Sequence, residues 1–284
     1  MMHAGLMTVA IAAAMLLRLV FVPRCLQDVH WLTVLSLFIV SPLLLLTTAV
    51  AIVIMGPHGH MVNPIEGWLS YGAAWGFLIL SAGLLAYLRW QAHISIVHIQ
   101  QYPQQLVQDI PSRLMDEDTA FSAQIGLWSS ELVISQGLLD TLDSDHLAAV
   151  IAHENGHAHY HDTFWIFWLG WLRRLSLWLP YTDKLWQELL LLREIRADSW
   201  ATRSVDRLTL AESLVQVIAA PLAPITVANF SCTVPSSRLS RRIDALLSEE
   251  NDYRFQPRWS FVTYGCIASL ILGLFPLCSI PFHY

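Results

Sequence analysis

The run HENGH, from His153 to His157, has the residue types and the spacing of a catalytic metal site. On a helix, residues four apart lie on one face about one turn apart, so both imidazoles can reach one zinc ion. Glu154, beside the first histidine, can take a proton from a water that the ion activates. The alternative is a solvated polar helix face, because a pattern with three fixed positions also occurs by chance.

A catalytic zinc ion needs a third protein ligand and one open position. The segment LREIRADSWA, at residues 192–201, can supply that ligand from a second helix. Glu194 and Asp198 are four residues apart, so Glu194 can bind the metal while Asp198 accepts a hydrogen bond from the distal nitrogen of a ligand histidine. The alternative is that both acidic residues form surface salt bridges with nearby arginines, namely Arg193, Arg196 or Arg203.

Two further histidines follow the motif. His157 and His161 are also four residues apart, but that register has no glutamate beside its first histidine, so we interpret His159 and His161 as solvated or outer positions. Hydrolysis also needs a donor for the developing oxyanion. Tyr160, His161 or one of the arginines can serve, and Asp162 either orients a neighbouring side chain or ends the helix.

The elements that position these residues are readable in part. Asp143 or Ser144 can cap the helix that carries the motif, and Thr182 or Asp183 can begin the next helix, which continues to about Arg203. Ala197 and Ala201 are small enough to let the two helices approach. The stretch 120–136 predicts a short hairpin or edge strand, in which residues 125–128 either bind an extended peptide or belong to an internal core strand.

The composition indicates a membrane protein. Of the 284 residues 55% are hydrophobic and only 13% are charged, against about 25% charged residues in an ordinary soluble domain. The net charge of −6 argues against direct nucleic-acid binding. The four cysteines lack C-x-x-C spacing, which argues against a cysteine-type zinc site or a redox motif.

Four apolar stretches are long enough to cross a bilayer. They are Ala4–Val22, Trp31–Met55, Trp68–Leu88 and Trp259–Pro281. Arg18 lies near one end of the first stretch, from which we expect it to reach the lipid–water interface. Residues 91–105 are expected to continue the third span as a helix, whereas residues 164–172 are too few to span and predict an interfacial or buried helix.

Arginines near the ends of the spans predict the orientation. They are Arg18, Arg24, Arg89, Arg254 and Arg258. All agree with a multi-pass protein of the plasma membrane whose two termini lie outside. The expected domains are residues 1–88 with three spans, residues 89–258 as a cytoplasmic zinc domain, and residues 259–284 with the fourth span. The expected fold is therefore mainly α, with an inserted α+β domain.

The run FSAQIGLWSSELVISQGLLDTLDSDHLAAVIAHENGHAHYHD, followed by LLREIRADSWA, resembles the BlaR/MecR-type antirepressor metallopeptidases. These are bacterial membrane gluzincins related to the HtpX and Ste-type proteases. The resemblance covers about Phe121 to Leu247, and it extends to three spans, a cytoplasmic zinc domain and a fourth span. The β-lactam sensors of this family carry a penicillin-binding domain after the fourth span, whereas this sequence ends at Tyr284.

The resemblance implies a zincin-like domain with one zinc ion per chain on His153, His157 and Glu194, with Glu154 as the base. It also implies cleavage of a cytoplasmic protein, such as a BlaI/MecI-like repressor or the chain itself, in signal-triggered regulation. Two alternatives stay open: a quality-control protease of the HtpX or Ste type, and a membrane transducer whose metal site is structural and takes His161 as a fourth ligand. The oligomeric state is not predicted.

Overall fold

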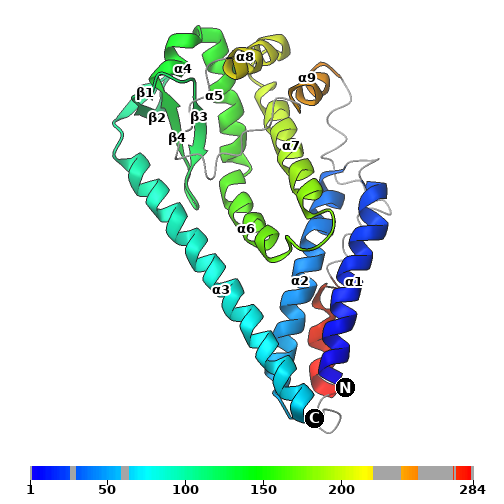
Figure 1. Ribbon diagram of the computed structural model, residues 1–284. Coiled ribbons are helices and arrows are strands. Elements are labelled where there is room, and N and C mark those ends of the chain that lie inside the picture. The colour runs from blue at the N-terminus through cyan, green and yellow to red at the C-terminus, as the bar shows by residue number, and fades with distance from the viewer. Residues whose placement is uncertain are drawn as a thin grey trace. The chain divides into compact units, whose positions relative to one another are not determined.

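The computed structural model describes residues 2–25, 30–58, 64–219, 238–248, 271 and 273–282. These residues form mostly helices and one small sheet, and their contacts divide the chain into two units (Figure 1). The first unit comprises Met1–Tyr87, Leu169–Leu189 and Arg254–Tyr284. The second comprises Leu88–Trp168 and Leu190–Tyr253. Residues 169–189, which the sequence assigned to the zinc domain, are thus grouped with the N-terminal helices.

Three long helices lie at the N-terminal side of the chain. They are α1 (Met2–Cys25), α2 (Trp31–Met55) and α3 (Pro64–Gln100). Each contains one of the first three predicted spans and is long and apolar enough to cross a membrane. Helix α3 continues past the predicted third span, as expected. The predicted fourth span lies mostly outside the described residues, and its described end forms the 3-10 helix η4 (Phe275–Phe282).

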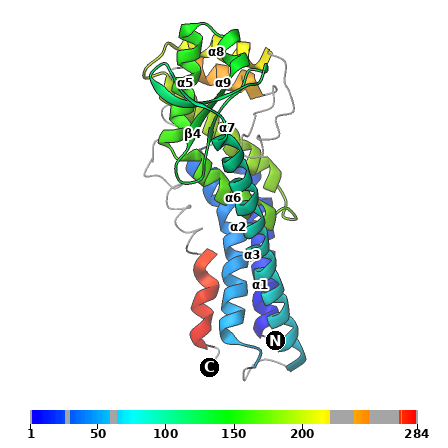
Figure 2. The same cartoon turned by 90° about the vertical axis from the view of Figure 1, so that its left-hand side faces the viewer.

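Helices α1 and α2 run side by side (Figure 2), and a buried arginine joins them. The Arg18 Nη2 atom donates to the carbonyl oxygen of Phe38 at 3.0 Å, and its Nε atom donates to Ser41 Oγ at 3.1 Å. Pro42 has no N–H group, so the Phe38 carbonyl lacks its usual helical donor, which Arg18 replaces. Arg18 is fully buried, and the expectation that it reaches the interface is wrong.

The sheet has four strands in the order β1-β2-β4-β3. They are β1 (Gln104–Val107), β2 (Ile110–Met115), β3 (Ser122–Ile125) and β4 (Glu131–Ser135). Strand β2 pairs antiparallel with β1 and parallel with β4, and β3 pairs antiparallel with β4, with Ala123 opposite Val133. The predicted hairpin therefore exists, and β3 forms one edge of the sheet.

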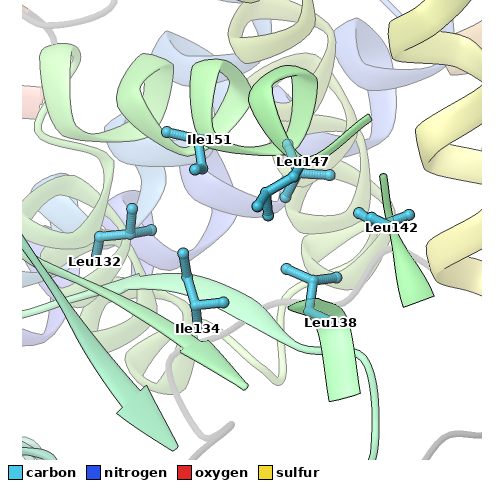
Figure 3. Packing of buried hydrophobic residues seen from close by; sticks show 7 residues of the cluster. Leu132, Ile134, Leu138, Leu142, Leu147 and Ile151 are labelled. Atoms are coloured by element: carbon cyan, nitrogen blue, oxygen red, sulfur yellow. The ribbon is translucent and has the colours of Figure 1, made fainter. Parts of the chain in front are cut away.

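The sheet buries apolar side chains on both faces. On one face it packs against α4 (Gln136–Thr141) and α5 (Ser144–His159) (Figure 3). That cluster includes Leu132, Ile134, Leu138, Leu142, Leu147 and Ile151. On the other face Ala123 and Ile125 pack near Ile99 at the end of α3. Burial of one leucine or isoleucine side chain stabilises the fold by about 1.5–3 kcal/mol. The cluster of Figure 3 therefore stabilises the packing of α5 on the sheet.

The remaining helices of the described chain are α6 (Asp162–Leu175), α7 (Thr182–Ala201), α8 (Arg207–Ala219) and α9 (Leu239–Leu247). Asp143 caps α5 by accepting from the backbone N–H groups of Asp145 and His146. Helix α8 packs against α5, where Ala149 contacts a cluster that includes Leu210 and Leu214. Helix α5 is thus enclosed by the sheet and α8.

Candidate metal centre

Three predicted ligands converge inside the second unit. His153 and His157 lie on α5 and Glu194 lies on α7, and all three side chains are buried. One potential ligand atom from each lies within 4.8 Å of the others. The Nε2 atom of His153 is 3.4 Å from Glu194 Oε2, and that of His157 is 3.7 Å from Glu194 Oε1. The group could therefore hold a metal ion.

These distances fit zinc. Bonds of about 2.0–2.2 Å in a tetrahedral arrangement place neighbouring ligand atoms about 3.5 Å apart, close to the separations between Glu194 and the two histidines. Imidazole nitrogen with carboxylate oxygen is also a donor set that zinc accepts. Within the described part of the chain, the group contains these three side chains and no fourth. Three protein ligands are the number that catalytic zinc sites use.

The close approach of α5 and α7 depends on a glycine. A Cβ atom at Gly156 would lie 3.1 Å from both the Cα and the carbonyl oxygen of Ala197, and 3.3 Å from its Cβ. The sequence pointed to Ala197 as a small residue in this contact, but not to Gly156. Because backbone atoms of Ala197 face Gly156, even a Cβ atom there would require the neighbouring helix to shift by a few tenths of an ångström.

Each histidine has a carboxylate at its second ring nitrogen. Asp162 Oδ2 lies 2.7 Å from His157 Nδ1 in a hydrogen bond. Asp198 Oδ1 lies 2.8 Å from His153 Nδ1, although the angles of that contact fall outside hydrogen-bond geometry. A carboxylate at Nδ1 favours the tautomer whose Nε2 is free to bind a metal. The sequence predicted this role for Asp198 and left Asp162 undecided.

Arg242, on α9, is a part of the site that the sequence did not predict. Its Nε and Nη2 atoms donate to the two carboxylate oxygens of Asp198, at 2.8 and 2.7 Å, and its Nη1 atom is 3.3 Å from Glu194 Oε2. Bidentate pairs of this kind are strong and fix the plane of the carboxylate. Arg242 therefore positions both acidic side chains of α7.

Two arginines of α7 complete the ion pairs. Arg193 donates to Glu194 Oε1, and Arg196 Nη2 donates to Asp162 Oδ1 at 2.5 Å. Of the surface salt bridges expected as the alternative, the structure contains the Arg193–Glu194 pair, which is buried, whereas Asp198 pairs with Arg242 and Arg196 pairs with Asp162. A carboxylate oxygen has two lone-pair sites, so an arginine and a metal can share it.

The ion pairs keep the carboxylates charged. Burial alone would raise the pKa of Glu194, but Arg193, the two histidines and Arg242 hold it well below its usual range. Burial likewise opposes ionisation of Asp198, and Arg242 and His153 lower its pKa. Burial lowers the pKa of His153, but Asp198 and Glu194 outweigh this effect and raise it to about 9.

Glu154 lies next to the edge strand. Its side chain is buried, and its Oε1 atom accepts a hydrogen bond of 2.9 Å from Ser122 Oγ on β3. In Figure 1, β3 is the strand nearest to α5. Glu154 therefore contacts the strand that lies at the edge of the sheet in the described part of the chain.

The other predicted site residues lie outside the three-residue group. The ring of Tyr160 faces the Arg196 guanidinium at 4.2 Å, and His159 stacks on Trp200 with ring centroids 3.7 Å apart. His161 is exposed in the turn after α5, with φ +52°. None of the three belongs to the metal-binding group of the described chain, so His161 is not placed there as a fourth ligand.

Comparison with known proteins agrees with this chemistry. Residues 102–186 match the family model described as Peptidase family M48. The match includes both histidines and Glu154, covers less than a third of the chain, and ends before Glu194. No curated protein and no solved structure matches the chain. The family match supports a metallopeptidase domain of the gluzincin type in this part of the chain.

Proposed function

We propose that this chain is a membrane-bound zinc endopeptidase in which His153, His157 and Glu194 bind the metal and Glu154 is the general base. The convergence of three buried ligand atoms within 4.8 Å, beside a buried glutamate, carries the proposal. The match to Peptidase family M48 supports it independently. Two arginines on Glu194 keep its carboxylate ionised, as a metal ligand must be.

A zinc ion in this site would supply Lewis-acid chemistry, which polarises a carbonyl group and acidifies water. Glu154 takes the proton of the attacking water on its carboxylate, which Ser122 holds in place by its hydrogen bond to Oε1. Glu154 then returns this proton to the leaving amine nitrogen. Asp162 holds His157 in place directly. Arg242 acts through Asp198, whose carboxylate lies beside His153.

Strand β3 is the proposed binding edge for an extended peptide. It lies at the edge of the sheet, and its first residue, Ser122, touches Glu154. Strand addition would satisfy the backbone hydrogen bonds of the peptide and carry its scissile bond past the base. An extended, unfolded segment of a protein is the substrate that such an edge accepts.

Replacing Glu154 by Gln tests the enzymatic role. We expect the purified variant to keep one zinc ion per chain but to cleave an unfolded protein such as casein about 10²–10⁴-fold more slowly. Glu117→Gln, an exposed position before β3, is the matched control and should cleave like the wild type. Full cleavage by the Glu154→Gln protein with zinc bound would contradict the role of Glu154 as the general base.

The aromatic residues of α3 support a membrane position for this helix. Trp68, Tyr87 and Trp90 are exposed on it, and Trp68 to Trp90 corresponds to about 33 Å of helical rise. This length matches a hydrocarbon core of about 30 Å with an aromatic residue at each interface.

Arg24 and Arg89, at span ends, favour a cytoplasmic peptidase domain with the N-terminus outside. An epitope at the N-terminus should bind antibody on intact cells. The same epitope in the turn at Gln108 and Asp109 should bind only after permeabilisation. The reverse pattern would refute this orientation.

The sequence resemblance favours a regulatory substrate, such as a cytoplasmic repressor, whereas the family match favours no particular substrate. Comparing the proteins of cells that carry the wild type or the Glu154→Gln variant separates the two roles. One fragment specific to the wild type would support regulatory cleavage. Many fragments from damaged membrane proteins would support quality control.

A further inference from the structure

A small cavity lies in the second unit, beyond the end of β3. It has a volume of about 170 Å³ and lies between the last turns of α3 and the loop that joins β3 to β4. Its apolar lining comes from Ile96, Ile99, Ile125, Leu127 and Trp128. Sites for small molecules and cofactors usually measure about 300–1,000 Å³, so this cavity has room for a single side chain.

The cavity favours an apolar occupant. The acidic residue in its lining, Glu131, is paired with Arg113, whose Nε atom lies 2.7 Å from Glu131 Oε2. The loop is also held in shape: Trp128 packs against Phe164 with ring centroids 5.0 Å apart. Gly126 has φ +149°, and a Cβ atom there would lie 2.0 Å from the Ser129 carbonyl oxygen, so this position requires glycine.

The register of β3 connects the cavity to the metal centre. Side chains alternate between the two faces of a strand. Ser122 faces Glu154, whereas Ala123 and Ile125 belong to the cluster on the opposite face, beside Ile99. Ile125 lies three residues beyond Ser122, which is about 10 Å along a strand. In an antiparallel pair, side chains directly opposite each other share a face. A peptide residue opposite Ile125 would therefore point toward the cavity.

We propose that the cavity between α3 and the β3–β4 loop binds a large apolar side chain of the substrate, three residues before the residue opposite Ser122 and therefore the fourth residue N-terminal to a bond cleaved directly after that residue. The direction follows because an antiparallel peptide runs from the Ile125 end of β3 toward Ser122, and antiparallel pairing is the more stable arrangement. This assignment rests on the proposed function, because it uses the position of Glu154. It makes the peptidase selective for leucine, isoleucine, methionine or phenylalanine at that position.

Ile96→Phe and Ile94→Phe form a matched pair of variants. Ile96 lines the cavity, whereas Ile94 is exposed on the same helix and does not line it. The full-length wild-type protein with zinc should cleave a randomised peptide library with at least tenfold enrichment of large apolar residues at the fourth position N-terminal to the cleaved bond. Ile96→Phe should abolish that enrichment with zinc content unchanged, and Ile94→Phe should preserve it. Cleavage by the wild type without this enrichment would overturn the cavity assignment and leave the peptidase intact.

A binding measurement tests the occupant of the cavity without requiring cleavage. The Glu154→Gln protein is irradiated with short peptides that each contain one photo-leucine, and the crosslinked residues are identified by mass spectrometry. We expect crosslinks at Ile96, Leu127 or Trp128, which Ile96→Phe reduces and Ile94→Phe does not. Crosslinks at other sites alone would refute the assignment. Crosslinks in the cavity together with a wild type that cleaves nothing would refute the proposed enzyme and retain the binding site.

Discussion

Arg242 donates two hydrogen bonds to Asp198, of 2.8 and 2.7 Å, and thereby ties α9 to the helix that carries Glu194. Both side chains are buried, and Asp198 in turn lies 2.8 Å from His153 Nδ1. The pair therefore links the C-terminal helix of the second unit to a proposed metal ligand. Through these bonds Arg242 fixes the position of the Asp198 carboxylate.

Arg242→Lys should weaken zinc binding without unfolding the protein. Lysine keeps the charge but cannot form the planar bidentate pair with Asp198, and changes at such outer positions typically cost about 10–100-fold in metal affinity. The dissociation constant, measured by competition with a chelator, should rise about tenfold, with an unchanged circular dichroism spectrum. Arg241→Lys, on the exposed side of α9, should leave both unchanged. Unaltered zinc affinity in Arg242→Lys would contradict the positioning role.

Asp162→Asn should also reduce zinc affinity, by about 10–100-fold, because the carboxylate at His157 Nδ1 is lost. The amide keeps the shape of the side chain but removes the charge that Arg196 pairs with. Asp145→Asn, an exposed position in the first turn of α5, is the control. Equal zinc affinity of the Asp162→Asn protein and this control would show that Asp162 only begins α6.

The two halves of the candidate metal centre were predictable because each follows from local periodicity within one helix. Four-residue spacing places His153 with His157, and Glu194 with Asp198, on single helix faces. Arg242 was not predictable in the same way, since it lies 44 residues after Asp198 and its contact with that side chain depends on how α9 packs. For Asp162 the sequence left two roles open, which are to orient a neighbouring side chain or to end the helix. The turn after α5 decides between them, because it sets the direction of the side chain.

The sheet was predictable only in part. The alternation in residues 120–136 predicted β3 and β4, but β1 and β2 were missed. The turn between those strands uses Gln108 and Asp109, both with positive φ, where asparagine and glycine are the usual residues. The contact of Arg18 with Phe38 was also missed. It depends on a carbonyl group in a different helix, which lacks its helical donor because Pro42 has no N–H group.

Gly156→Ala should destabilise the fold and lower the zinc content. Alanine normally stabilises a helix interior by about 1 kcal/mol relative to glycine. Here the added Cβ would lie 3.1 Å from backbone atoms of Ala197, and such overpacking typically costs about 1–3 kcal/mol. Gly170→Ala, on α6, is the control, because its Cβ would have its nearest contact at 3.7 Å and should not destabilise. Equal melting temperatures and zinc content for the two variants would contradict the close α5–α7 contact.

His146 should make the stability of the second unit depend on pH. It lies between Asp143, at 2.7 Å, and Glu212 on α8, at 3.3 Å. The hydrogen bond with Asp143, which outweighs the small effect of burial, and the contact with Glu212 raise the pKa of His146. The hydrogen bonds that His146 donates in turn lower the pKa of Asp143.

A raised folded-state pKa means that the contribution of His146 is complete below about pH 6.5, its unfolded value. The contribution is lost as the pH rises through the folded value. Asp143 sets the acidic limit of this stabilisation. The stability that its lowered pKa contributes is complete above about pH 3.9 and is lost below that. Glu212→Gln keeps His146 but removes its charged partner on α8. The difference in melting temperature between wild type and Glu212→Gln should therefore be largest near pH 5–6, shrink toward pH 9, and diminish in high salt because these groups are near solvent. A difference that stays constant from pH 5 to 9 would show that the histidine contributes no charge to the link between α5 and α8.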